Sequence, residues 1–193
     1  PANTPAAPKI TSETHPDSSG WSKERTAVLR WTLPADVVAV RTTLDESSTA
    51  IPTKVYDSPI KDITLSDLEE GVSYFHIQFK NAEGWGKVTH YRLAVDTTAP
   101  QNVVLSLKPD SNLANPMQIV VASTTDTNGS PIKTFKVQLN GAAPVEYKNE
   151  DGKNEIKLEN LAPGRQTIVV EVVDAAGNST VSTFTFEIES FEA

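Results

Sequence analysis

The residues best suited to chemistry in this 193-residue chain are its three histidines, its carboxylates and its tryptophans. His76 and His90 lie in two runs of alternating apolar and polar residues, and a turn centred near Glu83 places them opposite each other. Paired imidazoles can bind a transition metal or respond to pH. Gln78 and Arg92 beside them are poor metal ligands. The alternative is that both histidines only pack and hydrogen-bond on the solvated, outward face of a sheet.

The segment His15–Ser22 contains a histidine, an aspartate and serines, which are the residue types of a hydrolytic triad. Neighbours in one loop seldom form the fixed pocket and oxyanion hole that such catalysis needs. The sequence also lacks a GxSxG elbow, an HExxH motif and a phosphate-binding glycine loop. We therefore expect no enzyme, and a turn in which Asp17 accepts backbone N–H bonds.

Acidic residues gather where the ends of two β domains are expected to meet. They are Asp67, Glu69 and Glu70 in a corner, Asp96 at the start of a connector, and Asp126 and Asp174 in two later turns. Calcium takes about six to eight oxygen ligands from such carboxylates, amides and carbonyls. The hypothesis is an interdomain calcium site that stiffens the junction. The alternative is that these side chains are solvated and that Asp174 and Asn178 cap their own turn; EF-hand spacing is absent.

The three tryptophans differ in their surroundings. Trp31 lies in an apolar strand and is expected in the core. Trp21 in a loop and Trp85 between two glycines are candidate ligand-binding residues that can stack on a sugar or a peptide. The alternative is that both fold back over the open end of the core, since a binding pocket also needs convergent polar groups.

Composition excludes several classes of function. The net charge is −8 and the basic residues form no stripe, which argues against nucleic acid and anionic membranes as partners. The absence of cysteine excludes disulfides, thiolate zinc sites and thiol catalysis. No apolar run reaches the roughly 18 residues of a membrane helix. The chain begins with Pro1 and without a signal peptide, so we expect a segment of a longer polypeptide.

One unit of the sequence occurs twice. Ile63–Asp96 matches Ile156–Glu189 without a gap, and the match preserves the alternation of apolar positions. The matched residues are Phe75, Ile77 and Phe79 with Ile168, Val170 and Val172, then Tyr91, Leu93 and Val95 with Phe184, Phe186 and Ile188. Because side chains alternate faces along a strand, the same positions are expected to face the core in both copies.

Strand and turn signals predict an all-β chain of two tandem seven-stranded Greek-key β-sandwiches. We expect a Pro/Ala-rich linker at residues 1–8, a first sandwich at 9–97 and a second at 98–193. The strands expected in the first half are Lys9–Ser12, Thr26–Thr32, Val37–Leu44, Thr53–Tyr56, Ile60–Leu65, Val72–Lys80 and Lys87–Val95. Those expected in the second are Val103–Leu107, Met117–Ala122, Ile132–Leu139, Val145–Tyr147, Glu155–Leu158, Thr167–Val173 and Thr180–Ile188. Asn140-Gly141 is a hairpin signal.

These residues resemble known modules. Trp31, the corner Leu65-x-x-Leu68-x-x-Gly71 and the connector Asp96-Thr97-Thr98-Ala99-Pro100 are similar to fibronectin type III and bacterial immunoglobulin-like domains. The resemblance to modules of long bacterial surface proteins is carried by Thr14-His15-Pro16-Asp17, Trp21, Tyr74-Phe75-His76, Gly84-Trp85-Gly86, His90-Tyr91 and Asp174-Ala175-Ala176-Gly177-Asn178. In fibronectin modules a tyrosine at the position of Tyr74 points inward, whereas the alternation here places Tyr74 outside.

The resemblance implies a function outside catalysis. It suggests a structural spacer or stalk segment of an exported bacterial cell-surface or secreted protein, with neighbouring domains of the same polypeptide as partners. Two alternatives remain: an adhesive module for cell-wall glycan or another surface protein, using Trp21 and Trp85, and an accessory domain of a secreted enzyme. No cofactor is expected apart from the hypothetical calcium.

Overall fold

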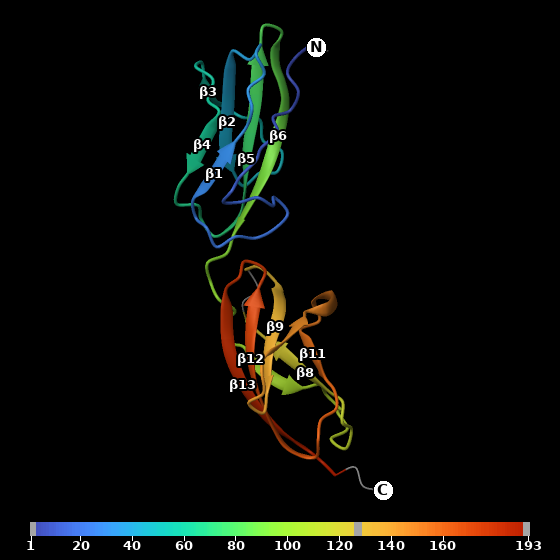
Figure 1. Cartoon of the computed structure of the whole chain (residues 1–193). Coiled ribbons are helices and arrows are strands. Elements are labelled where there is room, and N and C mark those ends of the chain that lie inside the picture. The colour runs from blue at the N-terminus through green and yellow to red at the C-terminus, as the bar shows by residue number, and fades with distance from the viewer. Residues whose placement is uncertain (1–2, 126–128, 191–193) are drawn as a thin grey trace. The chain divides into compact units, whose positions relative to one another are not determined.

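A computed structural model describes residues 3–125 and 129–190. The chain divides into two compact units, Pro1–Thr97 and Thr98–Ala193, each built from strands (Figure 1). Among the described residues, no helix is long and apolar enough to cross a bilayer.

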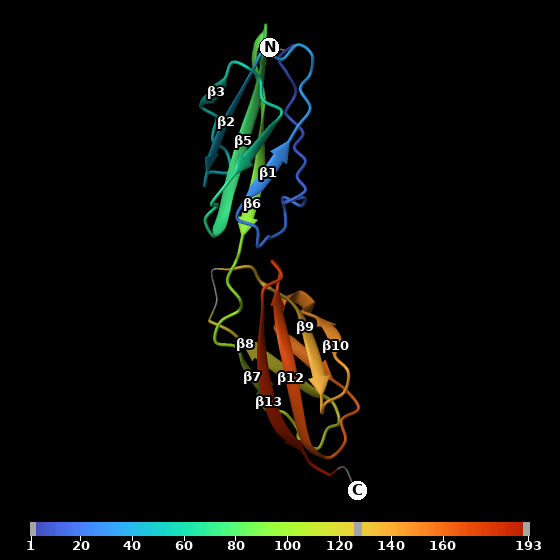
Figure 2. The same cartoon turned by 60° about the vertical axis from the view of Figure 1, so that its left-hand side comes forward.

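The first unit has two facing sheets. Its strands are β1 (Ala27–Arg30), β2 (Ala39–Asp45), β3 (Lys54–Tyr56), β4 (Asp62–Leu65), β5 (Gly71–Asn81) and β6 (Gly84–Val95). Strands β1 and β4 form one sheet, and the other has the order β3-β2-β5-β6 (Figure 2). The described residues thus give six strands instead of the expected seven. The predicted strand at Lys9–Ser12 is only a single bridge, in which Thr11 pairs with Arg30 of β1.

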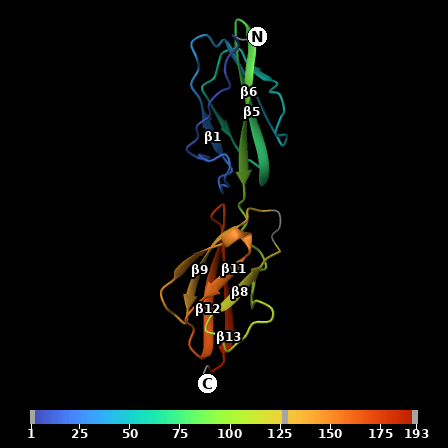
Figure 3. The ribbon, with the colours of Figure 1, turned by 90° about the vertical axis from the view of Figure 1, so that its right-hand side faces the viewer.

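In the second unit, residues 98–125 and 129–190 contain seven strands, the number expected. They are β7 (Val104–Leu107), β8 (Gln118–Ser123), β9 (Ile132–Leu139), β10 (Val145–Lys148), β11 (Glu155–Leu158), β12 (Gly164–Asp174) and β13 (Ser179–Ile188), with the short helix η1 (Glu150–Gly152). The sheets have the orders β11-β8-β7 and β10-β9-β12-β13, and the long strands β12 and β13 pair along the unit (Figure 3). Because β10-β9-β12-β13 matches β3-β2-β5-β6 strand for strand, the two units share one sandwich topology.

The predicted alternation of faces is confirmed in both copies. Phe75, Ile77 and Phe79 of β5 are 1%, 0% and 2% exposed. Their counterparts on β12, Ile168, Val170 and Val172, are all 0% exposed. Tyr74 is half-buried on the opposite face of the sheet, as the alternation predicted. Each unit therefore has a core of its own, and burial of this apolar surface stabilises the sandwich.

The corner before β5 is repeated before β12. Leu68 and Leu161 are 4% and 2% exposed and anchor the two corners in their cores. Gly71 and Gly164 follow at φ +109° and +108°, a conformation that residues with a Cβ rarely adopt. Glycine is needed at this point because the chain must turn sharply from the corner into the long strand.

Each unit begins with an entry segment that lies against its last strand. In the first unit this segment is residues 3–8: the Lys87 amide donates to the Pro5 carbonyl at 3.1 Å, and the Thr89 hydroxyl donates to the Pro8 carbonyl. The side-chain amide of Asn81 also donates to the backbone carbonyl of Asn3 at 2.8 Å. These bonds correct the expectation of a separate linker at residues 1–8, because the segment from Asn3 onward is bonded to the first sandwich. The N-terminal trace runs beside β6 (Figure 1).

The second unit starts in the same way. Its entry segment is residues 100–103: the Thr180 hydroxyl donates to the Pro100 carbonyl at 2.5 Å, and the Ser182 hydroxyl to the Val103 carbonyl at 3.4 Å. Thr180 and Ser182 are the counterparts of Lys87 and Thr89 in the gapless match. The repeat therefore extends to how the chain enters each sandwich.

Candidate functional site

The most distinctive surface is the outer face of the sheet β3-β2-β5-β6, turned away from the first core. We call this the outer face. It is formed by Arg41, Thr43 and Asp45 of β2, Tyr74, His76 and Gln78 of β5, and Trp85, Val88, His90 and Arg92 of β6. Strand register places these side chains together, since cross-strand neighbours lie within contact distance.

His76 and His90 are direct cross-strand partners, as the sequence predicted. Their Nδ1 atoms lie 2.6 Å apart, and His76 Nε2 lies 2.7 Å from Asp45 Oδ1. The expectation of a solvated His76 is wrong, because its side chain is 0% exposed. The ring of Tyr74 stacks at 6.4 Å and that of His90 lies edge-on at 4.8 Å, so neighbouring side chains cover an imidazole that points outward.

The contacts of this pair fix where its protons lie. Asp45 only accepts when ionised, so His76 Nε2 carries a proton and donates it to the carboxylate. The 2.6 Å between the two Nδ1 atoms then holds one further proton, donated by one imidazole to the other. Burial lowers the pKa of His90, and the charge of His76 lowers it further. The negative charge of Asp45 acts in the opposite direction.

The geometry differs from that of a metal site. Two imidazole nitrogens on a tetrahedral zinc ion lie about 3.3 Å apart, given Zn–N bonds of about 2.0–2.1 Å. The observed 2.6 Å is instead the spacing of a short hydrogen bond. The described residues contain no group of three or more His, Asp or Glu side chains placed to hold a metal.

Trp85 lies at one end of the outer face and is held by cations. The Arg41 guanidinium lies 4.3 Å and the Lys80 amine 5.8 Å from its ring centroid. Arg41 Nε also donates to Gln78 at 2.7 Å, and the Gln78 amide donates to the Gly86 carbonyl at 2.6 Å. The ring is therefore part of a cation–π cluster that hydrogen bonds join to Gln78 and Gly86.

Trp21 lies at the other end of the outer face. The Arg92 guanidinium is 5.5 Å from its ring centroid and donates to the carbonyls of Gly20 and Ser18 at 2.9 and 3.2 Å. Arg92 and Trp85 are seven residues apart on β6, which corresponds to roughly 23 Å along a strand. The two candidate tryptophans thus share one face but do not flank a single small-molecule pocket. The sequence gives no signal for the arginine partners of these tryptophans, which only the folded structure shows.

The segment His15–Ser22 has a structural role. His15 is 5% exposed, with Nε2 2.9 Å from the Glu24 carbonyl and Nδ1 3.0 Å from the Thr14 hydroxyl. Asp17 accepts the Ser19 amide at 2.9 Å and its hydroxyl at 2.6 Å, and these bonds lower the pKa of Asp17. The predicted turn at Asp17 is confirmed. Both ring nitrogens of His15 are occupied, and no serine of the segment is bonded to them.

The acidic residues proposed to bind calcium differ in their exposure and in their hydrogen bonds. Asp67 and Glu69 are exposed, and Glu70 accepts hydrogen bonds from the amide and hydroxyl of Thr97. Asp96 is 2% exposed, and its amide donates to the Ser22 carbonyl at 2.9 Å. Asp126 lies outside the described residues.

Asp174 caps its own turn, as one of the two alternatives expected. Its carboxylate accepts the amides of Ala176 and Asn178 at 3.0 and 2.9 Å. The calcium site stays a prediction. If it exists, millimolar calcium will raise the melting temperature above that in chelator, since a ligand of the native state stabilises it; equal temperatures contradict it.

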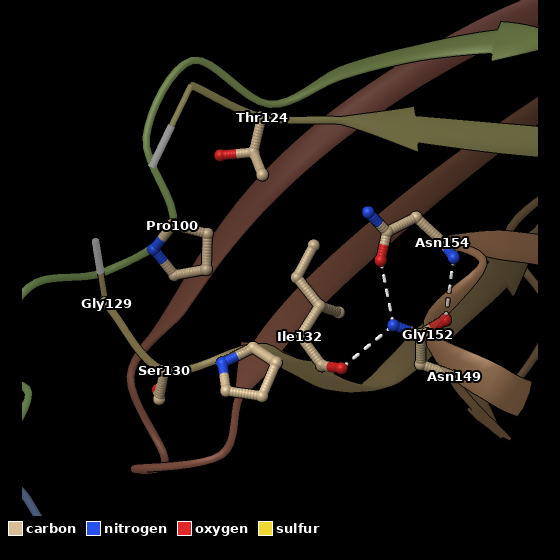
Figure 4. A pocket seen from close by; sticks show the side chains of 9 residues that line it. Pro100, Thr124, Gly129, Ser130, Ile132, Asn149, Gly152 and Asn154 are labelled. Carbon is tan, nitrogen blue, oxygen red and sulfur yellow. Dashed lines mark hydrogen bonds between the residues drawn. The ribbon is translucent and has the colours of Figure 1, made fainter. Parts of the chain in front are cut away.

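A small cavity lies in the second unit (Figure 4). Its volume is about 270 Å³, and it is lined by Pro100, Thr124, Gly129, Ser130, Pro131, Ile132, Asn149, Gly152 and Asn154. The Asn149 amide donates to the Ile132 carbonyl at 2.9 Å and to Asn154 Oδ1 at 2.8 Å. The lining residues include no charged side chain, and the side-chain amide of Asn149 holds the loop before β11 in place.

Comparison with known proteins gives a fold and no family. No protein-family model matches this chain, and no curated protein sequence matches it. Both units are similar to fibronectin type III modules. One solved structure that matches is that of the chicken CNTN1 FN1–FN3 domains, with 15% identity and a TM-score of 0.47; the match covers 97% of this chain and 68% of that one. Another is that of the Clostridium thermocellum CbhA fibronectin(III)-like modules, with 12% identity and a TM-score of 0.48; the match covers 95% of each chain. A two-domain fibronectin type III segment of chicken tenascin also matches (18%, 0.38, 96% and 99%). At these identities the likeness concerns the fold alone.

Proposed function

We propose that this chain is a non-catalytic spacer, a stalk segment of a larger bacterial cell-surface or secreted protein. The observation that carries the proposal is the direction of the entry segment. Pro5 contacts Lys87, Pro8 contacts Thr89, and Ser22 further along the chain forms a parallel bridge with Val95 at the end of β6. The chain thus enters beside the start of its last strand and leaves at the end of that strand.

This direction determines how tension acts on the bonds. When two parallel segments are pulled from opposite ends, their hydrogen bonds are loaded together in shear instead of breaking one at a time. The second unit has the same order of contacts, from Pro100 with Thr180 to Val103 with Ser182. Both units are therefore built to carry load along the chain, which is what a stalk requires.

The connector between the units is short and tied at both ends. Thr97 donates its amide to Glu70 at 2.7 Å within the first unit, and Pro100 accepts from Thr180 at 2.5 Å within the second. Only Thr98 and Ala99 lie between these two anchors. Little slack is therefore available when the ends of the chain are pulled apart.

Pulling single molecules from the two ends tests the proposal. We expect two separate unfolding events, one for each unit. Deletion of residues 1–8 is expected to lower the unfolding force of the first unit at least about twofold, because the bonds of its entry segment are lost. The second unit, which keeps its own entry segment, is the internal control. An unchanged force for the first unit contradicts the proposal.

Surface location and partners follow from the same proposal. The resemblance to surface modules supports export from a bacterial cell and attachment to neighbouring domains of one polypeptide, and the net charge of −8 and the absence of cysteine are compatible with either compartment. An accessory role beside a secreted catalytic domain uses the same mechanics, and the full-length reading frame distinguishes the two.

An adhesive module is the second candidate. The observation that favours it is the placement of Trp21, Trp85, Arg41 and Arg92 on one face. A glycan array with the wild type and with Trp21→Ala and Trp85→Ala variants distinguishes it from a spacer. Glycan binding by the wild type that is lost in both variants supports adhesion, whereas a spacer is expected to bind no glycan on the array.

A further inference from the structure

We propose that Asp45, His76 and His90 form a pH-sensitive latch on the outer face, in which one shared proton joins β5 to β6 and a second proton opens the pair. This goes beyond a spacer function, because it makes the first unit respond to acid. The latch connects three strands: Asp45 is on β2, His76 on β5 and His90 on β6.

The short contact between the imidazoles is what makes the pair sensitive. A separation of 2.6 Å between two Nδ1 atoms accommodates one hydrogen. When both imidazoles are protonated, two N–H groups and two positive charges face each other across this distance. Asp45 can neutralise only one of these charges, so the doubly protonated pair must separate.

Burial and bonding decide which side chain moves. His76 is 0% exposed and donates to Asp45, which also accepts the Ser47 amide at 3.0 Å. His90 is exposed on the outer side of β6. Protonation therefore keeps His76 beside its carboxylate and releases His90 into water, which adds a positive charge to the outer face and removes a cross-strand bond.

Four other titratable groups on the surrounding strands have partners of their own. Arg41 of β2 is bonded to Gln78, and Arg92 of β6 is bonded to loop carbonyls. Lys54 of β3 lies 5.2 Å from the ring of Tyr56. Tyr74 of β5 stacks on His76 through its ring. Asp45 is thus the carboxylate bonded to the pair, and its charge alone opposes the lowering of the His90 pKa that burial and His76 cause.

The direction of the pH effect follows from this lowered pKa. The pKa of His90 is lower in the folded state than its ordinary value of about 6.5. The stability that this difference contributes is complete at a pH above about 6.5, and it is lost as the pH falls through the pKa of the folded state. Acid is therefore expected to destabilise the first unit. The second unit contains no histidine, because the three are His15, His76 and His90.

Calorimetry of the whole chain at about pH 7.5 and about pH 5 tests the latch. The melting temperature of the first unit is expected to fall by at least roughly 5 °C more than that of the second, because a tenfold change in folding equilibrium shifts a domain of this size by roughly 5–10 °C. His90→Gln is the matched variant. Its amide can donate to neutral His76 or accept from protonated His76, so most of the extra shift should disappear.

A second readout keeps the proposal testable if the variant is destabilised. Imidazole ¹⁵N spectra of the wild type should show Nδ1 of one ring protonated and Nδ1 of the other unprotonated near neutral pH, with a coupled change in acid. Equal acid shifts in wild type and His90→Gln overturn the latch. Independent titration of His76 and His90 near the ordinary value also overturns it.

Discussion

Replacement of Gly86 by alanine is expected to detach the entry segment from β6 and to destabilise the first unit by about 1–3 kcal/mol. A Cβ at this position lies 2.0 Å from the Pro5 carbonyl oxygen, 2.8 Å from its carbon and 2.9 Å from its nitrogen. These are backbone atoms of a buried proline, so no side chain can rotate to make room. The 3.1 Å bond from the Lys87 amide to Pro5 is lost with them.

Chemical denaturation of Gly86→Ala, with and without residues 1–8, measures this effect. The substitution should be costly in the full chain and nearly neutral in the truncated one, because the three atoms nearest to the new Cβ all belong to Pro5 of the entry segment. Hydrogen exchange at the Lys87 amide should accelerate in the full-length variant. An equal loss of stability in both backgrounds would mean that β6 itself, and not the entry segment, excludes the methyl group.

Phe75→Ala is expected to have the larger effect, about 3–5 kcal/mol. The ring is 1% exposed and stacks on Trp31 with centroids 6.1 Å apart. Trp31 is 6% exposed and donates its indole N–H to the Ile60 carbonyl at 2.8 Å, so it is held and cannot fill the space left. The loss is comparable to the whole stability of a small domain.

The neighbouring Tyr74→Ala is the matched control for Phe75→Ala. Tyr74 is half-buried on the outer face and is not part of the core, so its truncation should cost about 1 kcal/mol. Thermal unfolding of the whole chain reports both variants, with the second unit as an internal reference. A cost for Tyr74→Ala equal to that for Phe75→Ala would contradict the assignment of faces.

Periodicity predicted the cores well because burial follows side-chain alternation in every strand of a sandwich. Phe75 and its counterpart Ile168 were correctly assigned to the core for this reason. The burial of His76 was not predictable in the same way. Alternation gives the face on which a side chain lies, and the turn placed His90 opposite His76, but no local pattern places Asp45 of β2 against this imidazole.

The entry segment was missed because its bonds use backbone carbonyls. Pro5 and Pro8 accept hydrogen bonds through their oxygens, and proline lacks only the donor. A proline- and alanine-rich composition therefore has the same appearance in a linker and in a segment bonded to a strand edge. The equivalent contacts of Pro100 and Val103 show that position relative to the repeat was the informative signal.

The hairpin signal at Asn140-Gly141 was correct for the turn, and the strand expected to start at Val145 is also present. Both residues have positive φ, 50° and 77°, and the Ala142 amide donates to the Leu139 carbonyl at 3.0 Å. Strands β9 and β10 begin to pair at some distance from this turn, where Val145 lies opposite Val137. Pro144 lies immediately before this point and has no N–H to donate, which delays the pairing.

The resistance of the contacts between the entry segment and β6 to tension is tested most directly by pulling the first unit in two geometries. Handles at residues 3 and 97 load the contacts between the entry segment and β6 in shear, whereas handles at residues 3 and 83 peel the same contacts apart from one end. We predict an unfolding force several times higher in the first geometry. Equal forces in the two geometries would show that the entry segment does not carry tension, and would contradict the spacer account.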